Sequence, residues 1–484
     1  MKLPEFTSFL IKHAEEHPVS FHMPGHKGSE IYRSLGYGGF LDNIMACDIT
    51  EIPGADNLFQ SEGVIESIME RYAALYEVDK SYLLINGTSG GLIASLLATV
   101  PKGGTVIMAR NSHKSIFNAL TLGDINPVYV YPTTLKEHGI AGPILPEEIK
   151  RLMAENPEAS AVVLPSPNYY GICSDIETIA KEVHKHGKVL IVDQAHGAHL
   201  KFFTRFVPKT RVNGASMPLC AEDRGADIVV NSTHKTLASL TQSAVLNCSF
   251  ERVDQDLLED KLQMIQSTSP SYLLMASLDI NASILENHGA MLMKEWADNL
   301  VNFYGWAKNI PDLKMIMPDG NFDFTKLNID LSRRGYSGRN LEEGLNEAHI
   351  YPELSSGNLL MLMTGIGNST NDYYKLTSAI KDLPILEKED EKDRVQLKKT
   401  LSLDNKKPPV RKAVPVKAIK ISLIEALGKT CAQSIIPYPP GIPLVCPGEV
   451  ITEEAIEIVR DLRGAGEKVM GITAEGEVFV GRDD

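Results

Sequence analysis

Residues 226–236 read ADIVVNSTHKT, an apolar run followed at once by hydroxyls, a histidine and a lysine. The β-branched content of the run predicts a buried strand, so Lys235 should lie on the turn where that strand ends. Scaffolds display reactive groups at such turns. A lysine in a partly desolvated pocket loses its proton more readily, and the neutral amine can form an imine with an aldehyde. The competing interpretation is a solvated surface lysine, and the rest of the chain has to decide between the two.

The region around this stretch alternates short β-rich runs with amphipathic helical stretches, from about Gly63 to Leu246. The predicted strands are residues 82–85, 105–109, 127–131, 161–164, 188–192, 228–230 and 243–247, and the predicted helices include 91–99, 146–155 and 175–186. Such alternation predicts an α/β fold with a mainly parallel sheet covered by helices. Sites in such folds collect beyond the carboxyl ends of the strands.

A glycine-rich turn, LINGTSGG at residues 84–91, follows the first predicted strand and leads into a helix that should start near Gly91. Free amides at a helix N-terminus attract an anion, and Thr88 and Ser89 can add hydroxyl donors. The turn lacks both the G-K-[ST] ending of a Walker loop and the G-x-G-x-x-G pattern. It therefore predicts a phosphate cradle of another kind, with a capped helix start that binds nothing as the alternative.

An aspartate ends the almost wholly apolar run KVLIVDQAH at residues 188–196. Asp193 should be desolvated there, so it needs a partner such as a protonated ring nitrogen. The alternative is that Asp193 caps a loop. His196, three residues later, could be a ligand, but a core or supporting role is the simpler interpretation.

A histidine follows another predicted strand, in RNSHKS at residues 110–115. His113 could stack its imidazole on a flat cofactor, or it could be a packed structural residue. Taken together, a phosphate cradle at Thr88, a strand-end aspartate at Asp193 and a strand-end lysine at Lys235 form a full set for holding pyridoxal 5'-phosphate (PLP).

The beginning of the chain departs from the alternating pattern. After a helix-like stretch at residues 6–16 it becomes rich in glycine, proline and histidine. His22 and His26 have the spacing of helical metal ligands, but Pro24 and Gly25 break the helix that would align them, so no metal site is predicted. An arm this irregular cannot bury its own core and should lie on something else, such as a second subunit.

The composition along the chain predicts five segments. They are an N-terminal arm (1–62), a large PLP-binding domain (63–270), a small α/β domain (271–385), a charged linker (386–415) and a C-terminal module (416–484). The small domain carries strand candidates at 326–331 and 359–364. The C-terminal module contains a proline-rich loop at 437–443, followed closely by an acidic residue, Glu449.

The overall composition is that of an ordinary globular protein. Its 484 residues are 43% hydrophobic and 23% charged, with a net charge of -14, which argues against a nucleic-acid partner. The N-terminus lacks the pattern of a signal peptide and no apolar run could span a bilayer, so we predict a cytoplasmic location and no membrane partner. The six cysteines form no C-x-x-C pair, which indicates reduced thiols rather than disulfides or a zinc site.

The motifs of the chain resemble a known family, the PLP-dependent ornithine/lysine/arginine decarboxylases of fold type I, in the short form found in bacteria. The resemblance covers nearly the whole chain, through FHMPGHK, NGTSGG, RNSHKS, VDQAHGAH, STHKTLASLTQ, TSPSYLLMASLD and YPPGIPLVCPGE. Two positions depart from the family pattern. Gln194 stands where the family commonly has glutamate, and PGADNL at 53–58 stands where relatives tend to show L-D-D-L.

The resemblance implies a role for each strand-end residue. Lys235 would be the Schiff-base lysine and Asp193 the partner of the pyridinium nitrogen, with His113 stacked on the ring and His196 near the cofactor. Lys235 or His234 could return a proton to the α-carbon of the substrate. The residues expected around the phosphate are Thr88, Ser89, Gly90, Ser232 and His234.

The function implied by the resemblance is decarboxylation of a basic amino acid, with arginine first, lysine next and ornithine third. Asp56 in the arm and Glu449 in the C-terminal module are the candidate anchors for the cationic side chain of the substrate. The alternatives are transamination, for which Arg333, Arg334 or Arg339 could hold the α-carboxylate, and a non-catalytic regulator of the polyamine pathway. We also expect a homodimer, following the general habit of this fold type.

Overall fold

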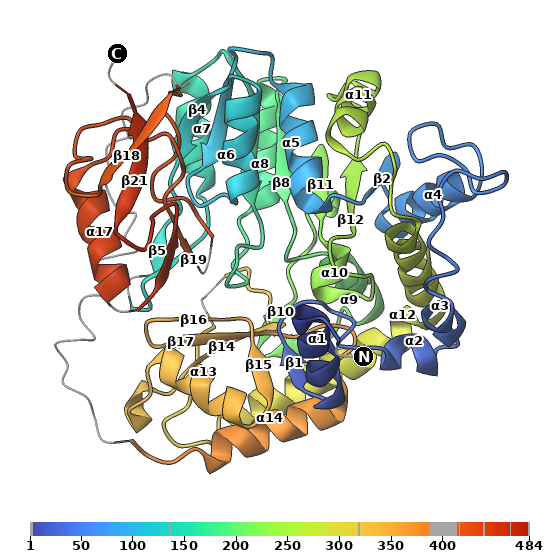
Figure 1. The fold of residues 1–484 in the computed structure, drawn as a ribbon. Helices are drawn as coiled ribbons and strands as arrows, with labels where there is room; N and C mark the ends of the chain where they lie inside the picture. The colour runs from blue at the N-terminus through green and yellow to red at the C-terminus, as the bar shows by residue number, and fades with distance from the viewer. Residues whose placement is uncertain are drawn as a thin grey trace.

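The computed structural model describes residues 3–135, 137–317, 320–386, 414–415, 417–438, 441–464 and 466–482. Figure 1 shows a large upper body around a central sheet, a smaller lower body, and the C-terminal module at one side of the upper body. The predicted charged linker (386–415) lies outside the described residues except for positions 386, 414 and 415.

A seven-stranded sheet organises the upper body, in the order β2-β12-β11-β8-β7-β3-β4. Its strands are β2 (Lys80–Leu84), β3 (Thr105–Ala109), β4 (Asn126–Val130), β7 (Ala159–Pro165), β8 (Val189–Asp193), β11 (Ile228–Asn231) and β12 (Ala244–Cys248). The pairs from β4 through β3, β7 and β8 to β11 are parallel, and β12 runs antiparallel to both of its neighbours. The predicted α/β fold with a mainly parallel sheet is therefore confirmed.

Helices cover both faces of this sheet because alternate residues of each strand point in opposite directions. Val106 and Met108 of β3 join the core beneath α5 (Gly87–Thr99), α6 (Lys114–Leu122) and α11 (Gln255–Ile265). Ile107 and Ala109 join the core beneath α7 (Pro146–Glu155) and α8 (Ile176–Lys185). The strands are thus buried on both faces, which explains their almost wholly apolar sequences.

Helix α5 begins one turn earlier than the sequence predicts, at Gly87 instead of near Gly91. The glycines indicate a turn, but their main role is close packing. A Cβ atom at Gly91 would lie 2.5 Å from Leu84 Cδ1 and 2.9 Å from Val230 Cγ1. Glycine therefore lets the first turn of α5 lie directly against the sheet.

The lower body is built on a four-stranded antiparallel sheet, β13-β14-β17-β16. These strands are β13 (Lys314–Met315), β14 (Lys326–Asp330), β17 (Leu359–Met363) and β16 (Leu354–Ser356), covered by α13 (Gly338–Glu347) and α14 (Thr370–Asp382). The 36-residue helix α12 (Tyr272–Ala307) connects the two bodies, and the Ser271 side chain caps its N-terminus by accepting from Leu274 N–H.

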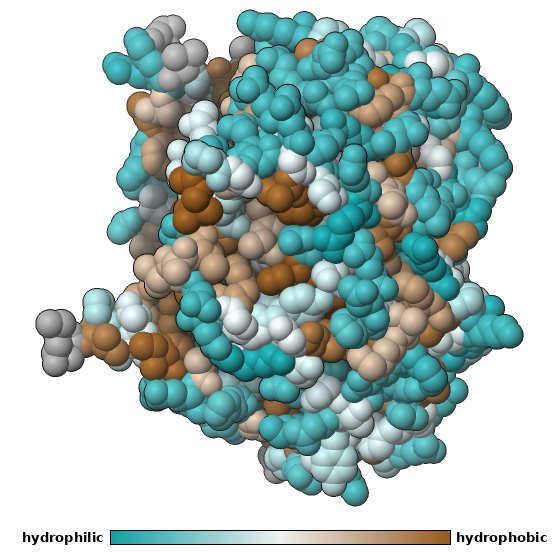
Figure 2. Space-filling model, turned by 90° about the vertical axis from the view of Figure 1, so that its right-hand side faces the viewer, coloured by the Kyte–Doolittle hydropathy of each residue, from teal (hydrophilic) through white to brown (hydrophobic). Residues whose placement is uncertain are grey.

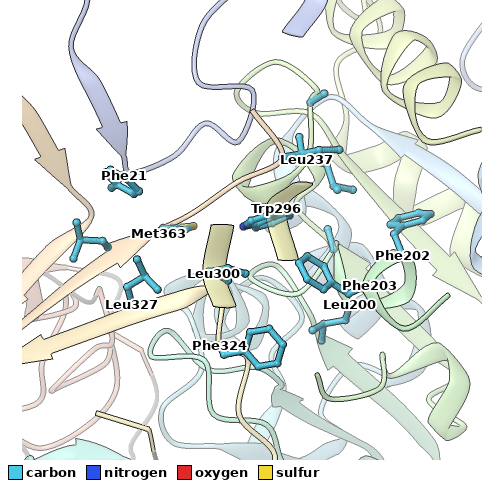
Figure 3. Close-up of a cluster of buried hydrophobic side chains, with 14 of the residues drawn as sticks. Phe21, Leu200, Phe202, Phe203, Leu237, Trp296, Leu300, Phe324, Leu327 and Met363 are labelled. Carbon is cyan, nitrogen blue, oxygen red and sulfur yellow. The ribbon is translucent and has the colours of Figure 1, made fainter. Parts of the chain in front are cut away.

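The N-terminal arm packs partly on its own chain. Its strand β1 (Val19–Phe21) pairs in parallel with β15 (Ile350–Pro352) of the lower body. Figure 3 shows Phe21 in the apolar cluster that also contains Trp296 of α12 and Met363 of β17. The arm also contains α2 (Glu30–Ser34) and α3 (Gly38–Asp42), and α4 (Val64–Tyr76) follows it.

Helix α1 (Glu5–Glu15) has no buried residue. Figure 2 looks onto the side that carries the arm and shows brown apolar patches among the polar surface. The exposed large apolar residues of the arm region are Leu3, Phe6, Phe9, Leu10, Ile11, Met45, Ile49, Ile52 and Val64. Apolar side chains exposed in such number on one segment are typical of a surface that contacts a partner.

The C-terminal module has a core of its own, formed by α17 (Glu453–Gly464) and two small sheets. One sheet pairs β18 (Ala418–Ser422) with β21 (Glu477–Gly481), and the other pairs β19 (Ile436–Tyr438) with β20 (Lys468–Met470). In Figure 1 the module lies beside β4, the edge strand of the large sheet.

Within the described part of the chain, no helix combines the length and the apolar character needed to cross a bilayer. The cytoplasmic location stays a prediction from the sequence.

Candidate active site

A cavity of about 250 Å³ opens at the carboxyl ends of β3, β7, β8 and β11. The upper body supplies most of its lining, the arm supplies Met23, and the C-terminal module supplies Gly441, Ile442 and Met470. The upper-body residues are Thr88, Asn111, His113, Lys114, Ala141, Pro165, Pro167, Asn168, Tyr169, Tyr170, Asp193, Ala195, His196 and Lys235. The strand ends of a parallel sheet share one edge, which is why residues so distant in sequence meet here.

Lys235 lies in the short helix α10 (Thr233–Thr236), directly after β11. Its Nζ lies 2.9 Å from Nε2 of His196, inside the cavity. Burial lowers the pKa of Lys235, although the charge of Asp193 opposes this shift. The surface-lysine interpretation is therefore wrong, and Lys235 has the setting that a reactive amine requires.

Asp193 ends β8 and is 7% exposed. Its Oδ1 accepts a hydrogen bond from Ala195 N–H at 3.1 Å. Burial raises the pKa of Asp193, while the positive charge of Lys235 acts in the opposite direction. A buried carboxyl group at the wall of a cavity is well suited to pair with a protonated ring nitrogen.

The residues predicted to hold a phosphate come together where α5 meets the turn after β11. Thr88 Oγ1 lies 3.1 Å from Ser232 Oγ, so two hydroxyls converge beside the first turn of α5. Thr88 lines the cavity, and Ser89 and Gly90 follow it in the same helical turn. Free backbone amides and two hydroxyls are the donors that a phosphate group needs.

His113 lines the cavity and caps α6, because its Nδ1 accepts a hydrogen bond from Ser115 N–H at 3.3 Å. Burial, together with the charges of Lys235 and Lys114, lowers the pKa of His113 to about 4. The ring is therefore neutral at ordinary pH, and its cap holds its position. A neutral, fixed imidazole fits the predicted stacking role.

His234, like Ser89, Gly90 and Ser232, is not among the described lining residues of the cavity. Its Nδ1 donates to the carbonyl of Ser243 at 2.7 Å, and burial lowers its pKa to about 4. The bond to the backbone occupies one ring nitrogen, and the role of His234 as a proton donor to the substrate stays a prediction from the sequence. Of the two candidates, Lys235 is the one at the cavity.

His196 is the residue whose surroundings the sequence does not reveal. Lys326 Nζ, at the start of β14, donates to the His196 carbonyl at 3.2 Å. The His196 ring also lies against Tyr169, with ring centroids 4.6 Å apart. Burial, aided by the charges of Lys235 and Lys326, holds the pKa of His196 well below its usual value. His196 is thus a neutral base at hydrogen-bond distance from Lys235.

Lys326 belongs to a fully buried charged network. Its Nζ lies 3.5 Å from Asp323 Oδ2, and Asp323 Oδ1 lies 3.2 Å from His199 Nε2. Although burial alone would raise the pKa of Asp323, His199 and Lys326 hold it well below its usual value. Nothing in the sequence around Asp323 or Lys326 indicates this role, because the network forms only when the start of β14 meets the segment that follows β8. Tyr169 could have been found, since it follows the β7 strand end.

Asp56 and Glu449, the predicted substrate anchors, do not line the cavity among the described residues. The Asp56 carboxylate sits at the N-terminus of α4, where it accepts from the backbone amides of Asn57, Glu62, Gly63 and Ile65. Glu449 is 1% exposed, with its oxygens near Tyr129, Cys446 and Arg110. Both carboxylates are already bonded within this chain, and their role as substrate anchors stays a prediction from the sequence.

Gln194, a departure from the family pattern, points away from the cavity. Its side-chain amide donates to Glu222 Oε2 at 2.9 Å and to Asn231 Oδ1 at 3.0 Å. A glutamate in the same position would face the Glu222 carboxylate. Glutamine at position 194 therefore suits the neighbouring Glu222 carboxylate, and this change does not alter the lining of the cavity.

A solved structure with the same fold is that of the constitutive lysine decarboxylase of Escherichia coli. The two chains superpose with a TM-score of 0.76 and 20% identity, over 99% of this chain and 82% of that one. This likeness shows the fold. With the strand-end lysine, aspartate and hydroxyls, it defines a fold type I PLP-dependent enzyme.

The chain belongs to the Orn/Lys/Arg decarboxylase family. The major domain of the family matches residues 4–321, and its C-terminal domain matches residues 405–474. The arginine decarboxylase of Bacillus subtilis is 32% identical over 96% of this chain and 94% of its own. The inducible lysine decarboxylase of Escherichia coli K12 is 24% identical over 95% of this chain and 77% of its own. The protein is thus a PLP-dependent decarboxylase of basic amino acids.

Proposed function

We propose that this decarboxylase converts L-arginine to agmatine and carbon dioxide, as a step of polyamine biosynthesis. The higher identity and coverage of the relative named arginine decarboxylase support arginine over lysine. Ornithine is the third choice.

The residues at the cavity fit PLP. Thr88, Ser232 and the first turn of α5 would hold the phosphate, Asp193 would pair with the ring nitrogen, and His113 would lie against the ring. Lys235 would carry the covalent link. When bound, PLP accepts the electron pair that the departing carbon dioxide leaves behind.

The proposed mechanism rests on the contact between Lys235 and His196. At 2.9 Å, a proton can pass directly between Lys235 Nζ and His196 Nε2. Burial lowers the pKa of both groups, so neither holds the proton firmly. Lys235 can therefore give a proton to the substrate carbon, while the neutral His196 ring accepts a hydrogen bond from the amine and holds it in position.

The apolar part of the cavity favours decarboxylation over transamination. Met23, Pro165, Pro167 and Ala141 line it, and no arginine is found among its described lining residues. Arg334 donates instead to the carbonyls of Ile380 and Pro311. Besides Lys235, Lys114 is the cation on the described lining, so a carboxylate here meets no two-pronged arginine clamp. A desolvated carboxylate without such a clamp is less stable than neutral carbon dioxide.

A side-by-side assay on arginine, lysine and ornithine tests the proposal, with carbon dioxide and the amine product both measured. Arginine should give the highest kcat/KM. A faster reaction with lysine or ornithine would contradict the substrate, and a keto acid product would contradict the reaction. Turnover of any of the three excludes a purely regulatory protein.

The proposal includes a homodimer. The exposed apolar residues of the arm, including Phe6, Phe9 and Met45, need a covering surface, and a second copy is the partner that the fold type favours. Sedimentation at the assay concentration should show a dimer. Phe6→Ser combined with Phe9→Ser should shift it toward monomer, whereas an active wild-type monomer would contradict this part of the proposal.

A further inference from the structure

The C-terminal module has its own core, yet it contributes Gly441, Ile442 and Met470 to the cavity. We propose that Arg110 and Glu449 form a clasp that seats the loop 441–449 as a wall of the active site, so that both act as positioning residues for substrate binding. This inference rests on the proposed function, which it extends to the role of the module.

Arg110 makes the upper-body half of the clasp. It follows β3 directly, and its backbone N–H donates to the Val130 carbonyl at 2.8 Å. Its guanidinium donates to the carbonyl of Pro443 at 2.6 Å and to that of Leu444 at 2.9 Å. One arginine therefore holds two consecutive carbonyls of the loop, which fixes the orientation of the loop as well as its distance.

Glu449 makes the module half. Its backbone belongs to the module, because its carbonyl accepts from Cys431 N–H at 2.8 Å. Its side chain reaches the upper body, where Oε1 accepts from Tyr129 O–H at 2.7 Å and Oε2 lies 3.5 Å from Arg110. Oε2 also accepts from Cys446 N–H at 2.8 Å, which ties the loop to the same carboxylate.

The clasp is dry and rigid. The Arg110 and Glu449 side chains are 7% and 1% exposed. The guanidinium carbon lies 5.2 Å from the centroid of the Phe117 ring and 5.3 Å from that of Tyr129. Water cannot replace a lost partner in a charge pair enclosed in this way. Breaking the pair would leave an unpaired buried charge, so both side chains are held in the paired geometry.

Two short connections link the clasp to the cavity. On the upper-body side, Arg110 is followed by Asn111 and then, two positions later, by His113, both of which line the cavity. On the module side, Pro443 is adjacent to Ile442. Loss of the clasp should therefore displace the Ile442 wall first, while α17 and the module core stay folded.

The test compares Glu449→Gln with Glu148→Gln, which makes the same chemical change in an exposed pair with Arg151. Glutamine keeps the size of Glu449, removes its charge and replaces one of the two accepting oxygens with an amide donor. In the holoenzyme we expect Glu449→Gln to raise the KM for the best substrate about tenfold and to change kcat less than about threefold. Glu148→Gln should change neither.

Hydrogen exchange provides a readout that does not depend on turnover. The amides of residues 441–446 should exchange about tenfold faster in Glu449→Gln, with α17 unchanged. Unchanged exchange in the loop would overturn the clasp, and equally faster exchange in α17 would show a purely structural role. If none of the basic amino acids is turned over, the proposed function fails, and the exchange data still decide the clasp.

Ile442→Ala separates the wall from the clasp. It removes the cavity side chain and leaves Arg110 and Glu449 in place, so KM should rise while exchange at 443–446 stays at the wild-type rate. A wild-type KM in this variant would overturn the inference that the loop forms part of the binding site.

Discussion

Two buried charged clusters flank the same cavity and act on it differently. The inner network, which contains His199, Asp323 and Lys326, reaches the site through the carbonyl of His196. The outer clasp of Arg110 and Glu449 reaches it through the carbonyls of a loop. The inner network therefore bears on the proton shared with Lys235, whereas the clasp bears on the shape of the wall. The function of a buried charge is decided by the group it contacts.

The largest effect on turnover is expected from substitution of Lys235, the amine that contacts His196. Lys235→Ala removes the amine that contacts His196, so kcat should fall by about a thousandfold or more, as for other essential catalytic groups. Lys181→Ala, at an exposed pair with Glu177, is the control and should behave as wild type. Carbon dioxide release is the measurement, and near-normal turnover in Lys235→Ala would end the proposed mechanism.

The next largest effect is expected when the inner network loses the positive charge of Lys326. Lys326→Met leaves Asp323 without its lysine partner, which lies 3.5 Å away, and frees the His196 carbonyl. We expect a loss of about 3–5 kcal/mol in the free energy of unfolding and a fall of about tenfold or more in kcat. Urea unfolding and steady-state kinetics check the two parts. A normal kcat in a folded Lys326→Met variant would show that the inner network does not affect the chemical step, contrary to the distinction drawn between network and clasp.

The pH dependence of the unfolding free energy should reflect the lowered pKa values of buried histidines, among them His113 and His234. The pKa values of His113 and His234 are lowered from 6.5 to about 4 in the folded protein. The unfolded chain therefore binds more protons between these values, and stability is lost as the pH falls from 6.5 toward 4. Each histidine should contribute a slope of about 1.4 kcal/mol per pH unit.

The histidine contribution can be isolated with one substitution. His234→Asn should reduce the slope of unfolding free energy against pH in that range, as measured by urea unfolding at several pH values. An unchanged slope would mean that His234 is already protonated in the folded state.

The smallest effect is expected at Asp56, which belongs to neither cluster. Asp56→Asn weakens the cap of α4 and should cost about 1 kcal/mol of stability, measured by thermal unfolding. KM should stay at the wild-type value, because the carboxylate bonds to backbone amides. A rise in KM above about threefold would restore the sequence-based role of Asp56 as a substrate anchor.

The strand-end part of the site was accessible from the sequence. Thr88, His113, Asp193 and Lys235 each follow a predicted strand, and parallel strands bring their carboxyl ends to one edge. Periodicity and turn composition are local signals, so they locate such residues without knowledge of the packing. The seven strands of the large sheet were predictable for the same reason.

The remaining features depend on contacts between distant segments. The role of Glu449 changes once Arg110 and Tyr129 are seen opposite it, more than 300 residues earlier in the chain. The role of Lys326 likewise appears only when the lower body packs against His196. The early start of α5 reflects packing at Gly91, which outweighs the local tendency of glycine to form turns.

The pairing of β1 with β15 has a consequence for the order in which the chain folds. Val19 lies opposite Ile350, so the strand made among the first must wait for a partner made about 330 residues later. At a synthesis rate of about 5–20 residues per second, this wait lasts on the order of tens of seconds on the ribosome. During this wait Phe21 lacks the apolar cluster in which it is finally buried. Met23, which lines the cavity, is not yet in place either. The binding site is therefore completed late, after the large sheet has had time to form.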